Sequence, residues 1–177
     1  VEKEKFATKL GYQTDCIQLK LADFKVYSNS FPEILEIGSL ILEKIEINEM
    51  VLTDYRDKNL PNAQGVKSLP REMLYSFPVK LSIDQILLKK ATITYIELAN
   101  GKSESGSISF SNVKGEITNI SNMHPDDTMK INGTGYLMNQ AAVSSQLAFP
   151  LNGNTFTASV NMGAFDMPIL NPMVRNL

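Results

Sequence analysis

The apolar residues of the stretch LEIGSLILEKIEINEMVL, residues 35 to 52, follow a spacing that fits neither a helix nor a regular strand. They stand two apart in pairs, and a step of three separates one pair from the next. A helix would show steps of three and four without the recurrent twos, whereas a plain strand would keep to twos. The pattern therefore predicts a β-strand whose alternation is reset at intervals.

The same spacing returns later in the chain. LEIGSLILEKIEIN aligns without gaps on LSIDQILLKKATIT, which matches Leu40 to Ile86, and shorter versions stand near residues 19 to 26 and 108 to 113. The residues inside the steps of three, such as Lys89-Lys90, are poor turn formers. A β-bulge explains them better, because one extra residue restores the apolar side chains to the same face and bends the strand.

The whole chain, residues 1–177, is expected to form a single β-rich segment of a longer protein. Asn100-Gly101 and Asn152-Gly153 stand between apolar runs, and this dipeptide is the strongest short signal for a two-residue hairpin turn. The expected elements are a short helix over 1–12, strands over 16–53 and 79–162, a loop with a short helix over 54–78, and the start of a C-terminal helix over 165–177.

The predicted fold is mainly β, a curved antiparallel sheet with bulged strands that form an apolar groove, with a few short helices at the ends and in one long loop. An apolar sheet face is commonly half of a closed core. Here only short helices are available as cover, and a wide uncovered apolar face indicates a groove, an interface or a membrane contact. The candidate residues of this face are Leu19, Leu21, Phe24, Val26, Ile37, Leu40, Leu42, Ile45, Ile47, Leu81, Ile83, Ile86, Leu88, Ile93, Ile108, Phe110 and Val113.

Charge and residue types argue against several classes of function. With 17 basic and 19 acidic residues, the chain has no basic surface for nucleic acid. The single Cys16 cannot form an internal disulfide and is expected to be a small buried hydrophobe. His124 stands near Asp126 and Asp127, but a metal or catalytic site needs a further converging group. We expect no catalytic residue, no metal and no cofactor.

Four stretches of the chain together resemble one known family. They are LEIGSLILEKIEINEMVLTDYRD, FPVKLSIDQILLKKATITYIEL, SISFSNVKGEITNI and GAFDMPILNPMV, and the likeness covers residues 17 to 174. Their pattern is similar to that of the AsmA-like family of Gram-negative envelope proteins, relatives of TamB and YhdP. In that family a short sequence pattern marks the start of a strand pair, and here it is matched by Phe77, Pro78, Leu81, Ile83, Asp84 and Ile86.

This resemblance implies a non-enzymatic segment that shields phospholipid acyl chains in an apolar groove and contributes to phospholipid transport and outer-membrane biogenesis. It also implies a periplasmic location, an inner-membrane anchor in a part absent from this chain, and contact with neighbouring segments of the same longer protein. Apolar area exposed to water costs about 25 cal/mol per Å², and a groove removes most of that cost.

Two alternatives stay open. One is an exported β-sandwich with a closed groove that binds other envelope proteins. The other is an enzyme that uses His124 with Asp126 and Asp127. Lipids extracted with the purified protein separate the first alternative from the leading hypothesis, and replacement of His124 tests the second.

Overall fold

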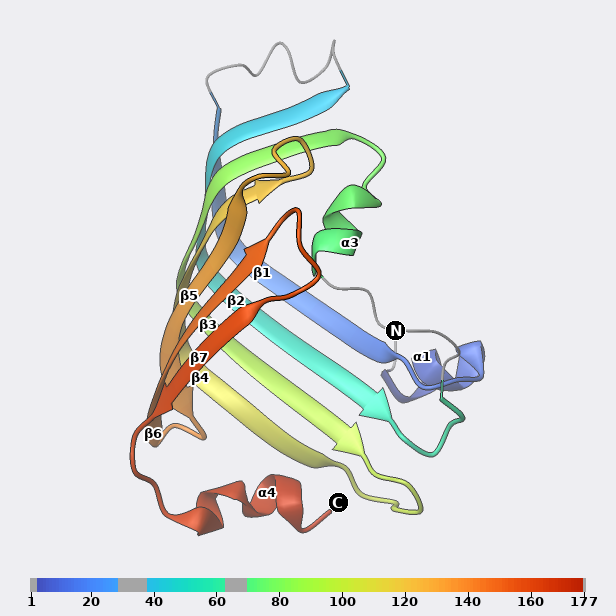
Figure 1. Ribbon diagram of the computed structural model, residues 1–177. Coiled ribbons are helices and arrows are strands. Elements are labelled where there is room, and N and C mark those ends of the chain that lie inside the picture. The colour runs from blue at the N-terminus through green and yellow to red at the C-terminus, as the bar shows by residue number, and fades with distance from the viewer. Residues whose placement is uncertain (1–2, 29–37, 63–69, 177) are drawn as a thin grey trace.

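Seven strands form one curved sheet in which the spatial order follows the sequence (Figure 1). The computed structural model describes residues 3–28, 38–62 and 70–176. The strands are β1 (Asp15–Tyr27), β2 (Ser39–Asp57), β3 (Lys80–Leu98), β4 (Gly106–Ser121), β5 (Thr128–Leu137), β6 (Ala141–Pro150) and β7 (Thr157–Met162). The helical segments are α1 (Lys3–Leu10), α3 (Pro70–Tyr75), η1 (Met167–Leu170) and α4 (Asn171–Val174).

The prediction of a mainly β fold with a curved, bulged sheet is confirmed, with one difference in strand direction. All neighbours are antiparallel except β2 and β3, which are parallel. Parallel neighbours need a crossover connection, and here residues 58–79, which include α3, supply it. β2 also continues to Asp57, past the predicted end at residue 53, because Tyr55 is buried and extends the alternation.

The repeated spacing corresponds to the register of this parallel pair. Leu40 lies beside Leu81 and Leu42 beside Ile83, whereas the sequence alignment had matched Leu40 to Ile86. A pattern of alternate steps of two and three repeats every five residues, so an alignment displaced by five residues fits equally well. The sequence therefore shows the repeat, and only the sheet fixes its register.

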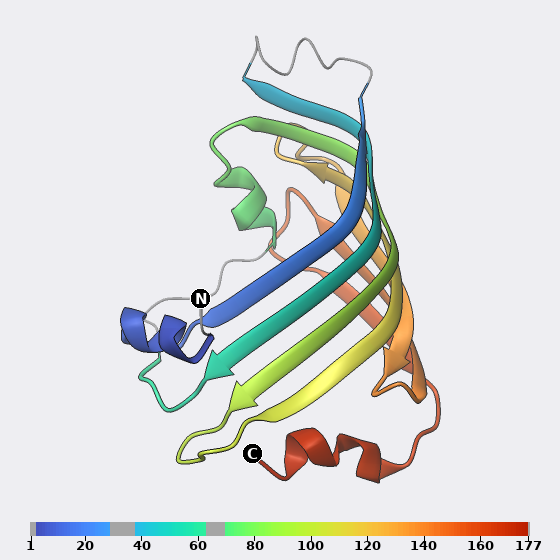
Figure 2. The same ribbon diagram turned by 180° about the vertical axis from the view of Figure 1, so that it is seen from behind.

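The steps of three coincide in neighbouring strands and keep one face apolar. One row of Cα partners crosses all seven strands, and its members are Val26, Ile45, Ile86, Ile117, Ile131, Leu147 and Ala158. Register shifts occur at Asp23 in β1, between Leu88 and Ala91 in β3, and between Ser111 and Lys114 in β4. The long strands curve along their length (Figure 2), as expected for strands that contain bulges.

The residues inside the steps of three turn to the outer face, where they form ion pairs. Lys90 Nζ lies 3.1 Å from Glu49 Oε1. Lys44 and Lys89 lie 2.7 and 3.0 Å from the two carboxylate oxygens of Glu46. Hydrogen bonds from these two lysines lower the pKa of Glu46 to about 2. The steps of three therefore bend the strands and place charged side chains on the outer face of the sheet.

The hairpin connections differ from the predicted turns. Antiparallel neighbours do flank Asn100-Gly101 and Asn152-Gly153, but the strands end at Leu98 and Pro150, so neither connection is a two-residue turn. The tight turn joins β5 to β6 instead. Met138 and Asn139 both have positive φ, 49° and 60°, and Gln140 N donates to Leu137 O at 3.0 Å. This is the geometry of a type I′ turn.

Asn139→Ala is expected to lower the free energy of unfolding by about 1 kcal/mol, because alanine tolerates the positive φ of this turn position less well than asparagine does. The measurement is urea unfolding. Asn139→Gly is the matched control and should stay close to the wild type, since glycine adopts this conformation without a side-chain clash. An Asn139→Ala protein that is as stable as the wild type would contradict this account of the turn.

One half of the inner, apolar face is sealed. We call this the sealed half: Leu42, Leu81, Ile83, Ile120, Met129, Phe149 and Leu151 form one buried cluster. Leu74 of α3 packs against it, and α3 lies on the inner side of the curved sheet (Figure 1). Asn122 holds this arrangement, because its Oδ1 accepts from Leu81 N at 2.7 Å and its Nδ2 donates to Val79 O at 2.8 Å.

Candidate functional site

The other half of the inner face, toward the ends of β1 to β3 that carry Asp15, Arg56 and Glu97, is apolar and partly uncovered. We call it the open half. Two neighbouring rows of Cα partners cross it. One row consists of Leu19, Leu52, Ile93, Phe110 and Leu137, and the other of Leu21, Met50, Ala91 and Val113. On the outermost strand β1, Ile17, Leu19 and Leu21 are 64%, 53% and 40% exposed. Apolar side chains in this number on one face mark a binding surface.

The open half deepens into a cavity of about 570 Å³ at the side away from β1. That volume lies within the range of about 300–1,000 Å³ found for ligand pockets. The strands supply Ile93, Ile108, Phe110, Val113, Leu137, Val143, Val160 and Met162, and the segment after β7 supplies Phe165 and Leu170. Gly133 and Gly135 also line it and leave room because they carry no side chain.

The C-terminal segment, residues 163–176, forms one wall of this cavity. It runs beside β4 (Figures 1 and 2), where β4 extends past the end of β5. Asn176 Nδ2 donates to Ser105 O at 3.1 Å, and Gly163 N donates to Ala142 O at 2.8 Å. A Cβ on Gly106 would stand 2.5 Å from the Met173 carbonyl oxygen, so only glycine permits this close approach.

The predicted face residues divide between the two halves. Ile93, Ile108, Phe110 and Val113 line the cavity. Leu19, Leu21 and Phe24 are exposed. Leu42, Leu81 and Ile83 are corrected to the sealed half, because α3 and the neighbouring strands leave them only 5–7% exposed. Val26, Leu40, Ile45 and Ile86 are partly buried against that cluster, Ile47 and Leu88 are half-buried, and Ile37 lies outside the described residues.

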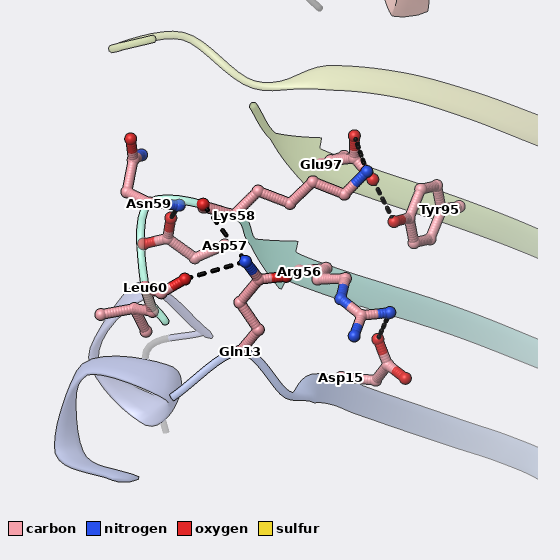
Figure 3. A network of polar contacts seen from close by, with 9 residues as sticks. All are labelled: Gln13, Asp15, Arg56, Asp57, Lys58, Asn59, Leu60, Tyr95 and Glu97. Carbon is pink, nitrogen blue, oxygen red and sulfur yellow. Dashed lines mark hydrogen bonds and ion pairs between the residues drawn. The ribbon is translucent and has the colours of Figure 1, made fainter. Parts of the chain in front are cut away.

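A charged row closes the open half at the strand ends (Figure 3). Asp15, Arg56 and Glu97 are successive Cα partners on β1, β2 and β3. Arg56 Nη1 lies 3.3 Å from Asp15 Oδ1, and Lys58 Nζ lies 2.9 Å from Glu97 Oε1. Opposite charges therefore alternate along the row. Arg56 and Lys58 are close in the sequence, whereas Glu97 joins them only through the parallel pairing of β2 and β3.

Glu97 is buried and remains ionised. Tyr95 Oη donates to Glu97 Oε2 at 2.5 Å. Burial on its own raises the pKa of Glu97, but the hydrogen bond from Tyr95 and the ion pair with Lys58 outweigh burial and lower the pKa below 4.5. Burial, with the hydrogen bond to this carboxylate, raises the pKa of Tyr95. The row is a polar boundary to the apolar surface.

Glu97 should make the free energy of unfolding depend on pH in the acid range. Its pKa is lower in the folded protein, so its contribution is present above about pH 4.5 and is lost as the pH falls below that value. Glu97→Gln is expected to lower the free energy of unfolding at neutral pH and to flatten its decline in acid. Urea unfolding over a pH series measures both effects. Glu104→Gln, in an exposed loop, is the control, and identical pH profiles for wild type and Glu97→Gln would contradict the prediction.

A larger hollow of about 740 Å³ lies on the outer face, lined by Lys89, Lys90 and Lys114 with polar neighbours. Lys89 is paired with Glu46 and Lys90 with Glu49. The rest of its lining combines polar and apolar side chains. The smaller cavity of the open half is the better candidate site, because its lining is predominantly apolar.

The alternative chemical site around His124 has no supporting geometry among the described residues. His124, Asp126 and Asp127 are exposed in the loop between β4 and β5, where Asp127 N donates to His124 O at 3.2 Å and Asn152 Nδ2 approaches Asp126 Oδ1 at 3.4 Å. Within residues 3–28, 38–62 and 70–176, no three His, Cys, Asp or Glu side chains gather to hold a metal ion. Cys16 is a free, buried thiol, which confirms its expected place.

Comparison with known proteins identifies no family for this chain. The sequence matches no protein-family model and no curated protein. In the part of the chain that the structure describes, none of the helices is both long enough and apolar enough for a membrane span. The functional argument therefore starts from the apolar inner face.

Proposed function

We propose that this protein binds hydrocarbon chains of lipids on the open half of its inner face, as a non-enzymatic segment of an AsmA-like envelope protein that contributes to phospholipid transport. The observation that carries the proposal is the continuity of one apolar surface from exposed Leu19 and Leu21 to the cavity under Phe165 and Leu170. Periplasmic location, an anchor in a part outside this chain and contact with neighbouring segments belong to the same proposal.

Size and chemistry support a hydrocarbon ligand. Six spacings between seven strands, at about 4.8 Å each, give a surface about 29 Å wide from β1 to β7. This width is comparable to the hydrocarbon thickness of a bilayer, about 30 Å. Each buried methylene contributes about 0.8 kcal/mol. The charged and polar groups of this face stand toward the strand ends. They occupy the row of Asp15, Arg56 and Glu97 and the adjacent row, where Asp54 and Tyr95 lie beside Ile17 and Ile108.

The alternative of a closed β-sandwich has less support. A sandwich buries its apolar face against a second sheet, whereas the described strands form a single sheet. α3 packs only on the sealed half, and the exposed apolar side chains of β1 have no such cover among the described residues.

Lipid analysis of the purified protein tests the proposal. The full chain is produced in a Gram-negative host, purified without detergent, and extracted with organic solvent for mass spectrometry. The expected result is bound phospholipid or fatty acid in a reproducible ratio to protein. Protein that carries no lipid, and that binds none when mixed with phospholipid vesicles, would contradict the proposal and would favour a protein-binding module.

A further inference from the structure

The hollow of about 740 Å³ on the outer face has no role in hydrocarbon binding on the inner face. It lies over the steps of three in β3 and β4, where Lys89-Lys90 and Asn112 interrupt the regular pairing. Thr134 and Ser144 on β5 and β6 have small side chains, which leave space beside the long side chains of the lysines. The volume lies within the range of about 300–1,000 Å³ found for ligand pockets. This face therefore has room for a small molecule.

One end of the hollow is basic. Lys89, Lys90 and Lys114 line it, and among the described residues no carboxylate side chain does. Lys114 is exposed and takes part in no ion pair within the described part of the chain. Three ammonium groups around one space favour an anionic ligand.

The nearby carboxylates do not use up the lysine donors. Lys89 pairs with Glu46 and Lys90 with Glu49, at 3.0 and 3.1 Å. Each ammonium group has three N–H donors, so each retains donors for a ligand. Glu116, two residues beyond Lys114 on β4, lines a neighbouring hollow and accepts a hydrogen bond from Gln85 Nε2 at 2.5 Å.

A row of uncharged polar side chains leads away from the basic end. Lys114 has Thr134 as its Cα partner, and Ser144 on β6 and Asn161 on β7 continue the row. All four residues line the hollow. Thr134 and Ser144 lie one and two strand spacings from Lys114, about 5 and 10 Å. Hydroxyl and amide groups both donate and accept hydrogen bonds, so this row suits the hydroxylated part of a ligand.

We propose that the outer hollow binds a phosphorylated sugar, with the phosphate at Lys89, Lys90 and Lys114 and the sugar hydroxyls along Thr134 and Ser144. A phosphate monoester has three terminal oxygens and a charge of about −1.5 to −2 at neutral pH, so it can accept hydrogen bonds from several ammonium groups at once. This site lies on the opposite face from the proposed hydrocarbon surface and does not depend on it.

Isothermal titration with glucose 6-phosphate, inorganic phosphate and glucose tests both parts of the site. The wild type should bind glucose 6-phosphate at least about tenfold more tightly than inorganic phosphate, because the hydroxyl row adds hydrogen bonds. Glucose should bind more weakly than either, since it lacks the charge that the lysines recognise.

Lys114→Gln should weaken the binding of glucose 6-phosphate by about tenfold or more, because a charge-assisted hydrogen bond is lost. The fold should be unaffected, since no ion pair of the described residues is broken. Lys130→Gln is the matched control and should stay within about twofold of the wild type. Lys130 is an exposed lysine on the same face of β5 that lines a different hollow.

Ser144→Ala tests the hydroxyl row. It should weaken the binding of glucose 6-phosphate by about threefold to tenfold and leave inorganic phosphate unchanged. Folded wild-type protein that binds neither phosphate compound at about 10 mM would overturn the site. Equal losses in Lys114→Gln and Lys130→Gln would overturn it as well, because they would show only a general effect of charge. Equal affinities for glucose 6-phosphate and inorganic phosphate would overturn the assignment of a sugar.

Discussion

Leu42→Asp is expected to unfold the protein. Leu42 is 5% exposed and lies in the apolar cluster that seals one half of the inner face. Truncation of a buried leucine alone costs about 2–5 kcal/mol, and an unpaired buried carboxylate adds to that cost. The sum approaches the whole stability of a typical domain, about 5–15 kcal/mol. Circular dichroism at neutral pH should show loss of the native β signal.

Leu42→Ala and Ile41→Asp provide the comparison. Leu42→Ala should remain folded with lower stability, because it leaves a cavity without a charge. Ile41 stands next to Leu42 on the other face of β2 and is 44% exposed, so Ile41→Asp should have a small effect. A folded Leu42→Asp protein with near wild-type stability would show that this half is also open, as the sequence had predicted.

Leu19→Asp is expected to remain folded and to lose hydrocarbon binding by more than about tenfold. Leu19 is exposed on the edge strand, so the carboxylate stays hydrated in the free protein. A bound chain would have to cover that charge, and desolvation of an unpaired charge costs more than the about 1.4 kcal/mol that corresponds to a factor of ten. Titration of a saturated fatty acid, together with urea unfolding, separates binding from stability.

Gln18→Asp is the control for that change. It adds the same negative charge to the adjacent residue, whose side chain lies on the outer face because side chains alternate along a strand. Binding by Gln18→Asp should stay within about twofold of the wild type. Equal losses in both variants would point to a general electrostatic effect on the ligand, and unchanged binding by Leu19→Asp would remove β1 from the site.

Local pattern predicted much of this fold because side-chain alternation depends on the nearest residues. The steps of two and three along β2 and β3 were sufficient to predict strands, bulges and a persistent apolar face. The direction of β2 relative to β3 was not predictable in the same way. It depends on the crossover through α3, and the five-residue period allowed a displaced register with equal agreement.

The boundary between the sealed and open halves was also beyond the sequence pattern. Leu42 and Leu21 occupy equivalent slots of the same spacing, yet Leu42 is covered through α3 and Leu21 is not. Cover comes from segments far away in the chain, so the pattern of one strand contains no information about it. The packing of α4 against Gly106 is likewise a contact between segments that are far apart in the chain.

The central claim is that lipid chains lie against the inner face of β1, and photo-crosslinking tests it most directly. A benzophenone amino acid is placed either at Leu21, on the inner face, or at Lys20, its outer-face neighbour. Cells that produce each variant are irradiated, and the purified protein is examined by mass spectrometry for added lipid mass. The account predicts lipid adducts at position 21 and none above background at position 20. Equal labelling at both positions, or none at position 21, would contradict it.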